Sequence, residues 1–451
     1  MSPITGTPIL TAAEMRSAEA AHGDSAFLME QAGQGIAGAI RRLVAGAEVL
    51  ILCGPGNNGG DGYVAARLLR EQGHAVRIAA AGEPKSDLAR AARTRWDGPV
   101  EPLAEAQPAP VLVDALFGTG LSRPLPDGVA TDLHRLAEAA RFRVAIDLPS
   151  GVASDDGCCL SMVPRFDLTL ALGSAKPAHL LYPAAGLMGE VRLIDLGLAP
   201  VSRASVMRRA DLPEPGPASH KYSRGMVAVV AGRMGGAAEL AAVSALRAGA
   251  GYVLHLGGRD PKGAPHAVVR RRWSAEALDD VRIGAVVIGP GLGRDDDARA
   301  RLDAVLASGR PLVIDGDALH LLDPDAPRGA PAILTPHQGE FDALFGKGEG
   351  SRIDRARAAA ARSGATVVLK GPDTVIADPD GRVIVATGGS PWLSTAGTGD
   401  VLAGATGAML SAGLSPFDAA TAAVRLHGRA AVACGRSFIA DDLAAALSRV
   451  R

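Results

Sequence analysis

Several features that would place this sequence in a common class of protein are scarce. Aromatic residues make up only 3% of the 451 positions, which leaves little material for platforms that stack on nucleic-acid bases. The net charge is −1, so no basic field favours nucleic acid or an anionic membrane. No apolar run approaches the roughly 20 residues of a membrane-spanning helix, and no signal peptide is recognisable. We therefore expect a cytoplasmic protein that binds neither nucleic acid nor membrane.

Metal-binding and P-loop motifs are also missing from the sequence. The four cysteines form no C-x-x-C pair, and no H-E-x-x-H segment is present, so zinc is not indicated. The cysteines are expected to be small buried residues of a protein in a reducing compartment. The chain has no G-x-x-x-x-G-K-[ST] segment, which argues against a P-loop nucleotidase.

The pattern that is present consists of short apolar runs alternating with amphipathic helices, in two blocks. The first block contains "VLILC", "AVRIAAA", "VLVDAL", "FRVAIDL" and "LTLAL", with "EVRLIDLG" closing the sheet, and the second contains "GMVAVVAG", "GYVLHLG", "AVVIGPG", "PLVIDG", "ATVVLKG" and "TVIADPDGRVIVAT". Continuous apolar strands predict parallel sheets covered by helices on both faces. A proline-rich stretch without periodicity separates the blocks. We predict two α/β domains, 1–205 and 220–451, joined by a linker at 206–219.

Polar residues follow three strands of the first block. In "CGPGNNGGDG" the glycines fit G-x-G-x-x-G only loosely, and the informative residues are Asn57, Asn58 and Asp61, although Asp61 could simply cap a helix. Asp114 ends the next strand, and Asp147 with Ser150 follows another. Because the carboxyl ends of parallel strands open onto one crevice, Asn58, Asp114, Asp147 and Ser150 are predicted to converge there.

The second block carries its strongest motif near the end, in "STAGTGDVLAGATGAML". The Gly-Thr-Gly turn precedes a helix predicted to start near Val401, where bare N–H groups favour a phosphoryl group. Asp400 is placed to take a proton from an attacking hydroxyl; the alternative is that it is only an N-cap residue.

These residues carry a resemblance to the NAD(P)H-hydrate epimerase domain, whose fold is a Rossmann-like three-layer α/β/α sandwich. "GPGNNGGDGYVAARLL", "DALFGTGLSRPL", "DLPSG" and "GSAKPAHLLYPAAGLMGEVRLIDLGL" resemble that family in order over roughly 10–200. The resemblance implies K⁺ held by Asn58, Asp114 and Ser150, and Asp147 as the candidate acid/base. It implies hydrated dinucleotide bound by Asn57, Asn58, Gly59, Gly60, Asp61, Gly118, Thr119, Gly120, Leu121, Ser122, Arg123 and Asp147.

The second block resembles the ribokinase-like NAD(P)H-hydrate dehydratases over roughly 220–445. The resemblance rests on "GPGLGR", "DGDAL", "LTPHQGEF", "VVLKGPDTVIADPDG", "AGTGD" and "LHGRAA". It implies a hydrate site at Ala237, Gly291, His337 and Asp400, with His337 alternatively a structural cap. It also implies a nucleotide site at Lys370, Gly371, Pro372, Asp373, Thr374 and Gly399, and Mg²⁺ oriented by Glu340 through water.

Together the resemblances imply a bifunctional repair enzyme of small-molecule substrates, expected to be a homo-oligomer. One domain interconverts the R and S hydrates of NADH or NADPH, and the other dehydrates the S form with ADP, giving AMP and phosphate. ATP is the alternative donor. Two other hypotheses remain: a vitamin-precursor kinase, such as a hydroxymethylpyrimidine or thiazole kinase, and a non-catalytic nucleotide-sensing first domain.

Overall fold

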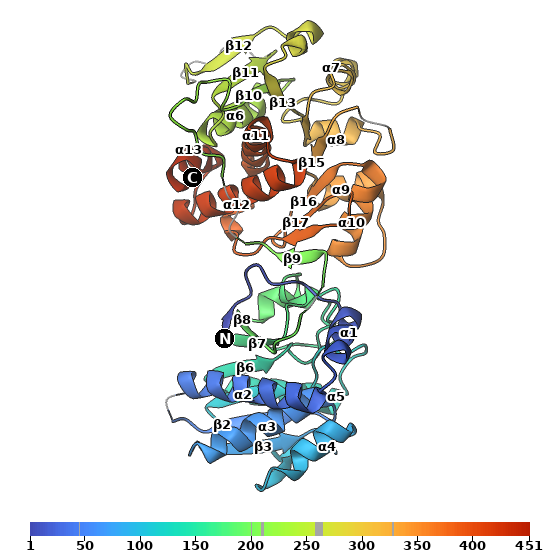
Figure 1. Ribbon diagram of the computed structural model, residues 1–451, viewed down its shortest axis with the longest axis vertical. Coiled ribbons are helices and arrows are strands. Elements are labelled where there is room, and N and C mark those ends of the chain that lie inside the picture. Colours follow the sequence, from blue (N-terminus) through green and yellow to red (C-terminus); the bar gives the residue numbers. More distant parts are fainter. Residues whose placement is uncertain (45, 200, 209–211, 258–264, 327–328) are drawn as a thin grey trace. The chain divides into compact units, whose positions relative to one another are not determined.

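The computed structural model describes residues 1–44, 46–199, 201–208, 212–257, 265–326 and 329–451. The chain divides into two compact units, Met1–Val206 and Met207–Arg451 (Figure 1). Residues 209–211 of the predicted linker lie outside the described residues, and its first residue ends a short strand, β9 (Ala204–Val206). The limits of the functional domains, 1–205 and 220–451, stay a prediction.

The first unit contains a sheet whose strands are parallel except for β1, which pairs antiparallel with β8. β1, and not β8, is therefore the edge strand, so "EVRLIDLG" does not close the sheet. In spatial order the strands are β1 (Ser2–Pro3), β8 (Glu190–Ile194), β7 (Leu168–Leu172), β6 (Phe142–Ile146), β5 (Val111–Ala115), β2 (Val49–Cys53), β3 (Val76–Ala80) and β4 (Val100–Pro102). The helices are α1 (Ala12–His22), α2 (Ser25–Leu43), α3 (Asn57–Glu71), α4 (Asp87–Thr94) and α5 (Asp127–Ala139), with 3₁₀ turns at Leu103–Glu105, Pro177–His179 and Ala184–Leu187.

The side chains of β2 show why this sheet is covered on both faces. Val49 and Ile51 pack into the apolar cluster that includes α2 and α3, whereas Leu50 and Leu52 pack into the cluster that includes α5. Alternate residues of a strand point to opposite faces, so an unbroken apolar run needs helices on both. The predicted three-layer arrangement is confirmed, and α2, α3 and α4 are seen over one face in Figure 1.

The second unit contains a sheet that is parallel from β12 to β16 and ends in an antiparallel meander. In spatial order its strands are β12 (Val268–Arg271), β11 (Tyr252–Leu256), β10 (Met226–Val230), β13 (Ile283–Ile288), β14 (Leu312–Ile314), β15 (Ala332–Leu334), β16 (Thr366–Leu369), β17 (Val375–Ala377) and β18 (Val383–Val385). The helices are α6 (Gly235–Arg247), α7 (Asp296–Ala307), α8 (Asp317–Leu321), α9 (Gln338–Phe345), α10 (Arg352–Ser363), α11 (Thr398–Ser411), α12 (Pro416–Cys434) and α13 (Ala440–Val450), with 3₁₀ turns at Ala275–Asp279 and Pro391–Leu393.

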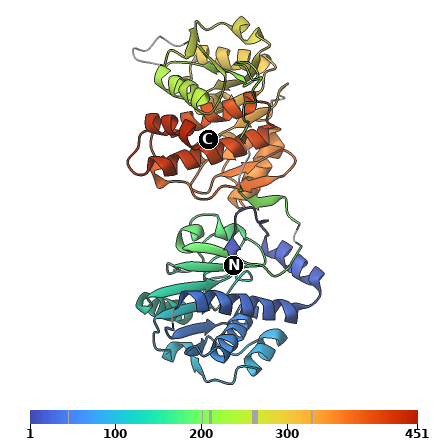
Figure 2. The ribbon, with the colours of Figure 1, turned by 60° about the vertical axis from the view of Figure 1, so that its left-hand side comes forward.

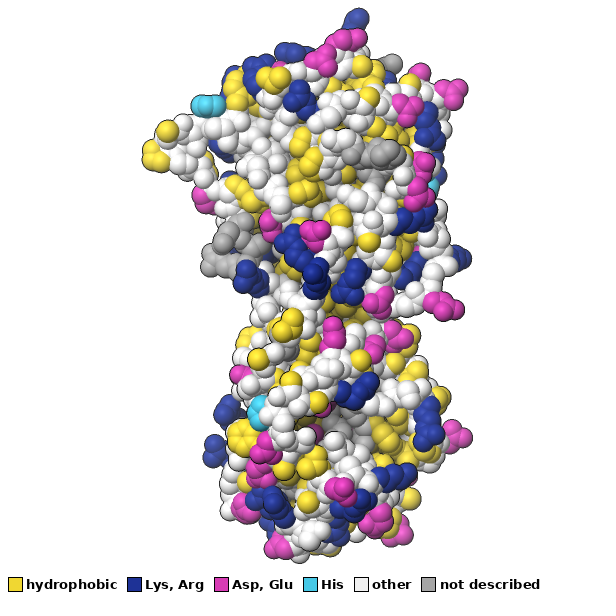
Figure 3. Space-filling view, turned by 45° about the vertical axis from the view of Figure 1, so that its right-hand side comes forward, with side chains coloured by type: hydrophobic (Ala, Val, Ile, Leu, Met, Phe, Trp, Pro, Cys, Tyr) yellow, Lys and Arg dark blue, Asp and Glu magenta, His cyan; other side chains and the backbone are white. Residues whose placement is uncertain are grey.

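The main core of the second unit lies on the face covered by α6, α11, α12 and α13. Residues of these helices form one buried cluster with alternate residues of β10 and β13, and α11 packs between α6 and α12 (Figure 2). None of the helices in the described ranges is long and apolar enough to cross a membrane. On the face shown in Figure 3, basic and acidic side chains are interspersed over both units, in keeping with the net charge of −1.

One expectation about the cysteines is wrong. Cys53, in β2, is buried as expected, but Cys158 and Cys159 are exposed and Cys434 is only partly buried. The exposed pair lies in the irregular segment after Gly151, which no apolar strand pattern marks as interior.

Candidate active sites

Asp114 and Ser150 meet at the carboxyl edge of the first sheet. Asp114 lies in β5 and is fully buried, as is Ser150. The carboxylate accepts hydrogen bonds from the Ser150 backbone N–H at 2.8 Å and from the Ser150 hydroxyl at 2.7 Å. Burial raises the pKa of Asp114 to about 6, although the hydrogen bonds from Ser150 act in the opposite direction. Because no lysine or arginine of the described residues pairs with Asp114, this buried carboxyl suits a cation.

The Gly118 turn brings Asn58 and Asp147 to the same crevice. A Cβ atom on Gly118 would lie 3.0 Å from Asn58 Oδ1 and 3.3 Å from Asp147 Oδ2, so the backbone passes close to both side chains. The neighbouring Phe117 N–H donates to the Ser150 hydroxyl at 2.9 Å. The amide nitrogen of Asn58 is buried and has no hydrogen-bond partner among the described residues. The predicted convergence of these four polar residues is therefore present in the structure.

Asp147 is held by a network that the sequence did not reveal. Its backbone is left-handed, with φ of 62°, which is uncommon for a residue other than glycine. Lys176, whose side chain is 1% exposed, donates from Nζ to Asp147 Oδ1 at 2.5 Å and to the Leu172 carbonyl at 2.6 Å. The Thr119 hydroxyl contacts the other carboxylate oxygen. Burial by itself would raise the pKa of Asp147, but the Lys176 ammonium lowers it below its ordinary value.

His179 fixes the backbone beneath this ion pair. Its Nδ1 accepts from the Lys176 N–H at 2.9 Å, so its Nε2 carries the proton that it shares with the Asp147 carbonyl at 2.6 Å. Burial lowers the pKa of His179 to about 4, so the ring is neutral at physiological pH. His179 therefore holds the left-handed turn in place without adding charge.

Two further acids face the Asp147–Lys176 pair. Asp61 is buried in α3, four residues after its start, so it is not the helix cap. Burial raises the pKa of Asp61 well above its ordinary value, and the charges of Asp147 and Glu19 raise it further. Burial also raises the pKa of Glu19, which belongs to α1. The surroundings therefore shift the pKa values of these two carboxyls in opposite directions, that of Asp147 downward and that of Asp61 upward.

Of the other residues predicted for the hydrate in this unit, Gly59 and Gly60 are buried at the start of α3 and Leu121 is half-buried. Gly120, Ser122 and Arg123 are exposed, and Asn57 is exposed with its Oδ1 accepting from the Ser86 hydroxyl at 2.6 Å. Sequence reasoning missed Lys176, His179 and Glu19. Lys176 comes soon after the buried strand β7, but this position alone does not indicate that a lysine will be buried.

A second cluster of charged residues lies at the carboxyl edge of the other sheet. Lys370 Nζ donates to Asp315 Oδ1 at 2.7 Å, and the Thr335 hydroxyl donates to the same oxygen at 2.7 Å. A Cβ atom on Gly399 would lie 3.3 Å from Lys370 Nζ, so the predicted nucleotide residues Lys370 and Gly399 are adjacent. Asp315 was not among the predicted residues, although it directly follows β14.

Asp400 lies in the first turn of α11, which begins at Thr398 and not near Val401. The N-cap position belongs to Gly397, with φ of 89°, so Asp400 is not the cap. His427 of α12 contacts the Thr398 carbonyl at 2.9 Å and supports this start. Burial raises the pKa of Asp400 to about 7, Asp315 raises it further and Lys370 opposes the shift. Asp400 is thus suited to exchanging a proton near neutral pH.

His337 and Glu340 cap α9 together. The Glu340 N–H donates to His337 Nδ1 at 3.1 Å, and the His337 N–H donates to the Glu340 carboxylate at 2.8 Å. The capping alternative for His337 is therefore present in the structure, and its side chain, 61% exposed, can still meet a ligand. The backbone of this loop joins the next one, because the Lys370 N–H donates to the Pro336 carbonyl at 2.8 Å.

Ala237 and Gly291, predicted for the hydrate, are neighbours at the start of α6. A Cβ atom on Gly291 would lie 3.1 Å from the Ala237 Cβ, and the Met234 N–H donates to the Gly291 carbonyl at 3.0 Å. Leu240 of the same helix borders Gly397, because a Cβ there would lie 2.9 Å from its side chain. The start of α6 therefore adjoins the start of α11.

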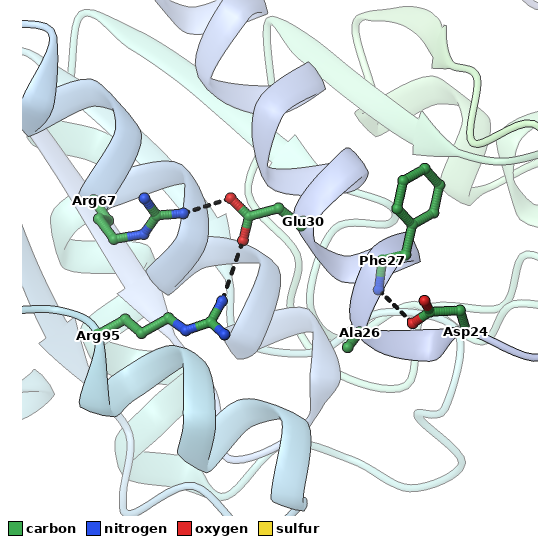
Figure 4. Close-up of a pocket in the computed structure, with 6 residues that line it drawn as sticks. All are labelled: Asp24, Ala26, Phe27, Glu30, Arg67 and Arg95. Carbon is green, nitrogen blue, oxygen red and sulfur yellow. Dashed lines mark hydrogen bonds and ion pairs between the residues drawn. The ribbon is translucent and has the colours of Figure 1, made fainter.

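Figure 4 shows a depression on the first unit that contains none of these residues. It is lined by Asp24, Ala26, Phe27, Glu30, Arg67 and Arg95. The Glu30 carboxylate pairs with both arginines, with an N–O distance of 3.7 Å to Arg95. Because Glu30 already pairs with Arg67 and Arg95, we assign the depression no catalytic role.

Each unit thus has an α/β fold with a cluster of acids and one lysine at the carboxyl edge of its sheet, as in a two-domain enzyme. Residues 25–178 match the family model described as YjeF-related protein N-terminus, and residues 227–450 match the one described as NAD(P)H-hydrate dehydratase. The chain belongs to the family of bifunctional NAD(P)H-hydrate repair enzymes.

Relatives match over nearly the whole chain. The bifunctional NAD(P)H-hydrate repair enzyme Nnr of Thermofilum pendens is 35% identical, over 90% of this chain and 86% of its own. The protein of the same name from Gloeobacter violaceus is 37% identical, over 95% of this chain and 94% of its own. Among solved structures, the ADP/ATP-dependent NAD(P)H-hydrate dehydratase from Bacillus subtilis, co-crystallized with ATP/Mg²⁺, is 33% identical with a TM-score of 0.48, over 53% of this chain and 93% of that one.

Proposed function

We propose that this chain repairs hydrated NADH and NADPH with two active sites. The first unit interconverts the R and S hydrates, and the second dehydrates the S hydrate at the expense of ADP. The observation that carries the proposal is that each unit places its own cluster of buried acids, paired with one lysine, at the carboxyl edge of its sheet. Fusion of the two sites lets one supply the epimer that the other consumes.

The first site handles protons at the hydroxyl-bearing carbon of the hydrate. The fixed carboxylate of Asp147 accepts a proton from one epimer and returns it as the other forms, so the step has no net proton change. Asn58, Asp114 and Ser150 offer only oxygen ligands, which suit a hard cation such as K⁺. The cation would supply positive charge beside the buried Asp114 and keep it ionised.

The second site carries out phosphoryl transfer followed by elimination. Asp400 takes the proton of the ring hydroxyl, whose oxygen attacks the terminal phosphorus of ADP while AMP leaves. Phosphate then departs with the electrons of its C–O bond, and loss of a proton from the adjacent carbon restores the dihydronicotinamide. Lys370 and the N–H groups at the start of α11 stabilise negative charge on the phosphoryl oxygens. Glu340 would orient Mg²⁺ through water, and Mg²⁺ would neutralise the phosphates.

The test uses the reduced-nicotinamide absorbance band. A mixture of R and S NADH hydrate should regain the whole band with ADP, Mg²⁺ and K⁺, with release of inorganic phosphate. Recovery without ADP or ATP would contradict the dehydratase chemistry, and recovery of only half would contradict epimerisation. A stable phosphorylated product with hydroxymethylpyrimidine or thiazole would instead support the vitamin-precursor kinase. The same assay, run with ATP and with NADPH hydrate, decides donor and substrate preference.

Two further properties belong to this proposal. We infer a cytoplasmic enzyme, because the substrates proposed for it are water-soluble nucleotides, and we separately propose that it forms a homo-oligomer. Subcellular fractionation and sedimentation of the full chain test the two properties separately.

Potassium should control epimerisation through Asp114. In Asp114→Ala the cation loses its charged ligand, so we expect epimerisation at a fixed K⁺ concentration to fall about 10–100-fold. K⁺ should raise the melting temperature of the wild type but not of the variant, because a bound ion stabilises only the state that binds it. Unchanged epimerisation with an unchanged K⁺ response would show that this carboxyl holds no ion, whereas a wild type without epimerisation would favour the sensor hypothesis.

Dehydration should depend on pH with a limb near neutrality. Asp400 must be ionised to act as a base, and its pKa is about 7, so kcat/KM for the S hydrate should fall about tenfold per pH unit below pH 7 and level off above it. The measurement is the pH profile of kcat/KM at saturating ADP. A profile flat from pH 5 to pH 8 would exclude Asp400 as the base.

A further inference from the structure

Arg352 joins the two loops that carry the ligand-binding residues of the second unit. It is the first residue of α10, with its side chain 19% exposed. One guanidinium nitrogen donates to the Lys370 carbonyl at 3.2 Å and to the Leu369 carbonyl at 3.4 Å. Another contacts the side-chain oxygen of Gln338, the first residue of α9. A single side chain thus contacts the end of β16 and the start of α9.

The same guanidinium neutralises an acid within the predicted nucleotide turn. Its Nε lies 3.0 Å from Asp373 Oδ1, and the Asp373 side chain is only 2% exposed. Without the positive charge of Arg352 beside it, this buried carboxylate would repel the phosphates of a nucleotide. A Cβ atom on Gly371 would lie 2.6 Å from the guanidinium, so the turn is folded tightly over Arg352.

The backbones of the two loops are joined by the pairing of His337 with Lys370. Arg352 adds a side-chain connection next to it, because Gln338 directly follows His337. The Arg352 guanidinium, with its five N–H donors, therefore affects three properties at once. These are the shape of the turn, the charge around Asp373 and the position of the His337 loop.

We propose that Arg352 is a positioning residue for nucleotide binding: it shapes the Lys370–Thr374 turn, neutralises Asp373, and ties the turn to the loop that carries His337. The inference rests on the proposed function, in which that turn binds ADP. In this proposal Arg352 acts through the residues that it contacts and not by binding ADP or hydrate itself. Its loss should weaken ADP binding more than hydrate binding.

The test compares Arg352→Met, Arg352→Lys and a matched control. In Arg352→Met we expect the KM for ADP to rise about 10–100-fold, and the dissociation constant of Mg·ADP, measured by calorimetry without hydrate, to rise by the same factor. The KM for the S hydrate should change less than about threefold. Arg352→Lys keeps the charge but not the forked donors and should lie between. The control is Arg362→Met, because Arg362 also pairs with an aspartate through two hydrogen bonds, at the far end of α10. It should leave both KM values within about twofold.

A double variant separates charge from shape. In Arg352→Met with Asp373→Asn the carboxylate that Arg352 neutralises is gone, so ADP affinity should recover partly relative to Arg352→Met alone. Wild-type ADP affinity in both Arg352 variants would overturn the proposal, as would equal rises in both KM values with a lowered melting temperature. Arg352→Lys carries the test if Arg352→Met does not fold. Failure of the wild type to convert S hydrate with ADP would instead overturn the proposed function.

Discussion

Asp400→Asn lowers kcat for dehydration of the S hydrate by about 10²–10⁴-fold and leaves ADP affinity within a few-fold. Asparagine has nearly the same shape but cannot accept the hydroxyl proton, so the oxygen that attacks phosphorus stays a weak nucleophile. The carboxyl lies beside Lys370 and Asp315, which are untouched by the substitution. The measurement is single-turnover dehydration, followed by absorbance and by release of phosphate.

Asp418→Asn is the control for this variant. Asp418 occupies the third position of α12, just as Asp400 occupies the third position of α11, so both contribute charge near a helix start. Because Asp418 lies outside the charged cluster, its substitution should leave dehydration unchanged. Equal activity of Asp400→Asn and the wild type would refute general-base catalysis by Asp400.

Lys176→Met should abolish epimerisation and destabilise the first unit. Removing one partner of a buried ion pair typically costs about 3–5 kcal/mol, because the other charge stays buried without compensation. Asp147 would lose the ammonium that lowers its pKa, so its protonated form would persist to higher pH. We expect a lower melting temperature and loss of R-hydrate conversion, measured with the S hydrate as an internal reference for the second unit.

The double variant Lys176→Met with Asp147→Asn distinguishes stability from catalysis. It leaves no buried charge in the pair, so the melting temperature should recover most of the loss. Epimerisation should not recover, because the proton acceptor is gone. A double variant that epimerised at the wild-type rate would show that Asp147 is not the acid/base and that the pair is only structural.

The sheets and the meeting of Asp114 with Ser150 were predictable because they follow from short-range rules. Fully apolar runs such as Val49–Cys53 indicate strands buried on both faces, and parallel strands bring their carboxyl ends together. The catalytic and binding roles of the predicted residues stay predictions until the variants above are measured.

Lys176 and the start of α11 could not be predicted in the same way. A lysine is seldom fully buried, and the partner of Lys176 is distant in the chain and reached through a left-handed backbone at Asp147. The start at Thr398 depends on Gly397 adopting a positive φ, which the neighbouring glycines could equally have adopted.

The first helix, α1, lies outside the segment that matches the family model. The matched family segment starts at residue 25, yet α1 ends at His22, and its Ala12 N–H is anchored by the Asp155 carboxylate at 2.7 Å. Glu19 on that helix raises the proton affinity of Asp61 in the crevice. A fragment beginning at residue 25 would keep every motif named above but would lack Glu19. The pKa of Asp61 would then be raised less than in the full chain. The segment that is enough to recognise the family is therefore shorter than the segment that supplies all the acids of the crevice.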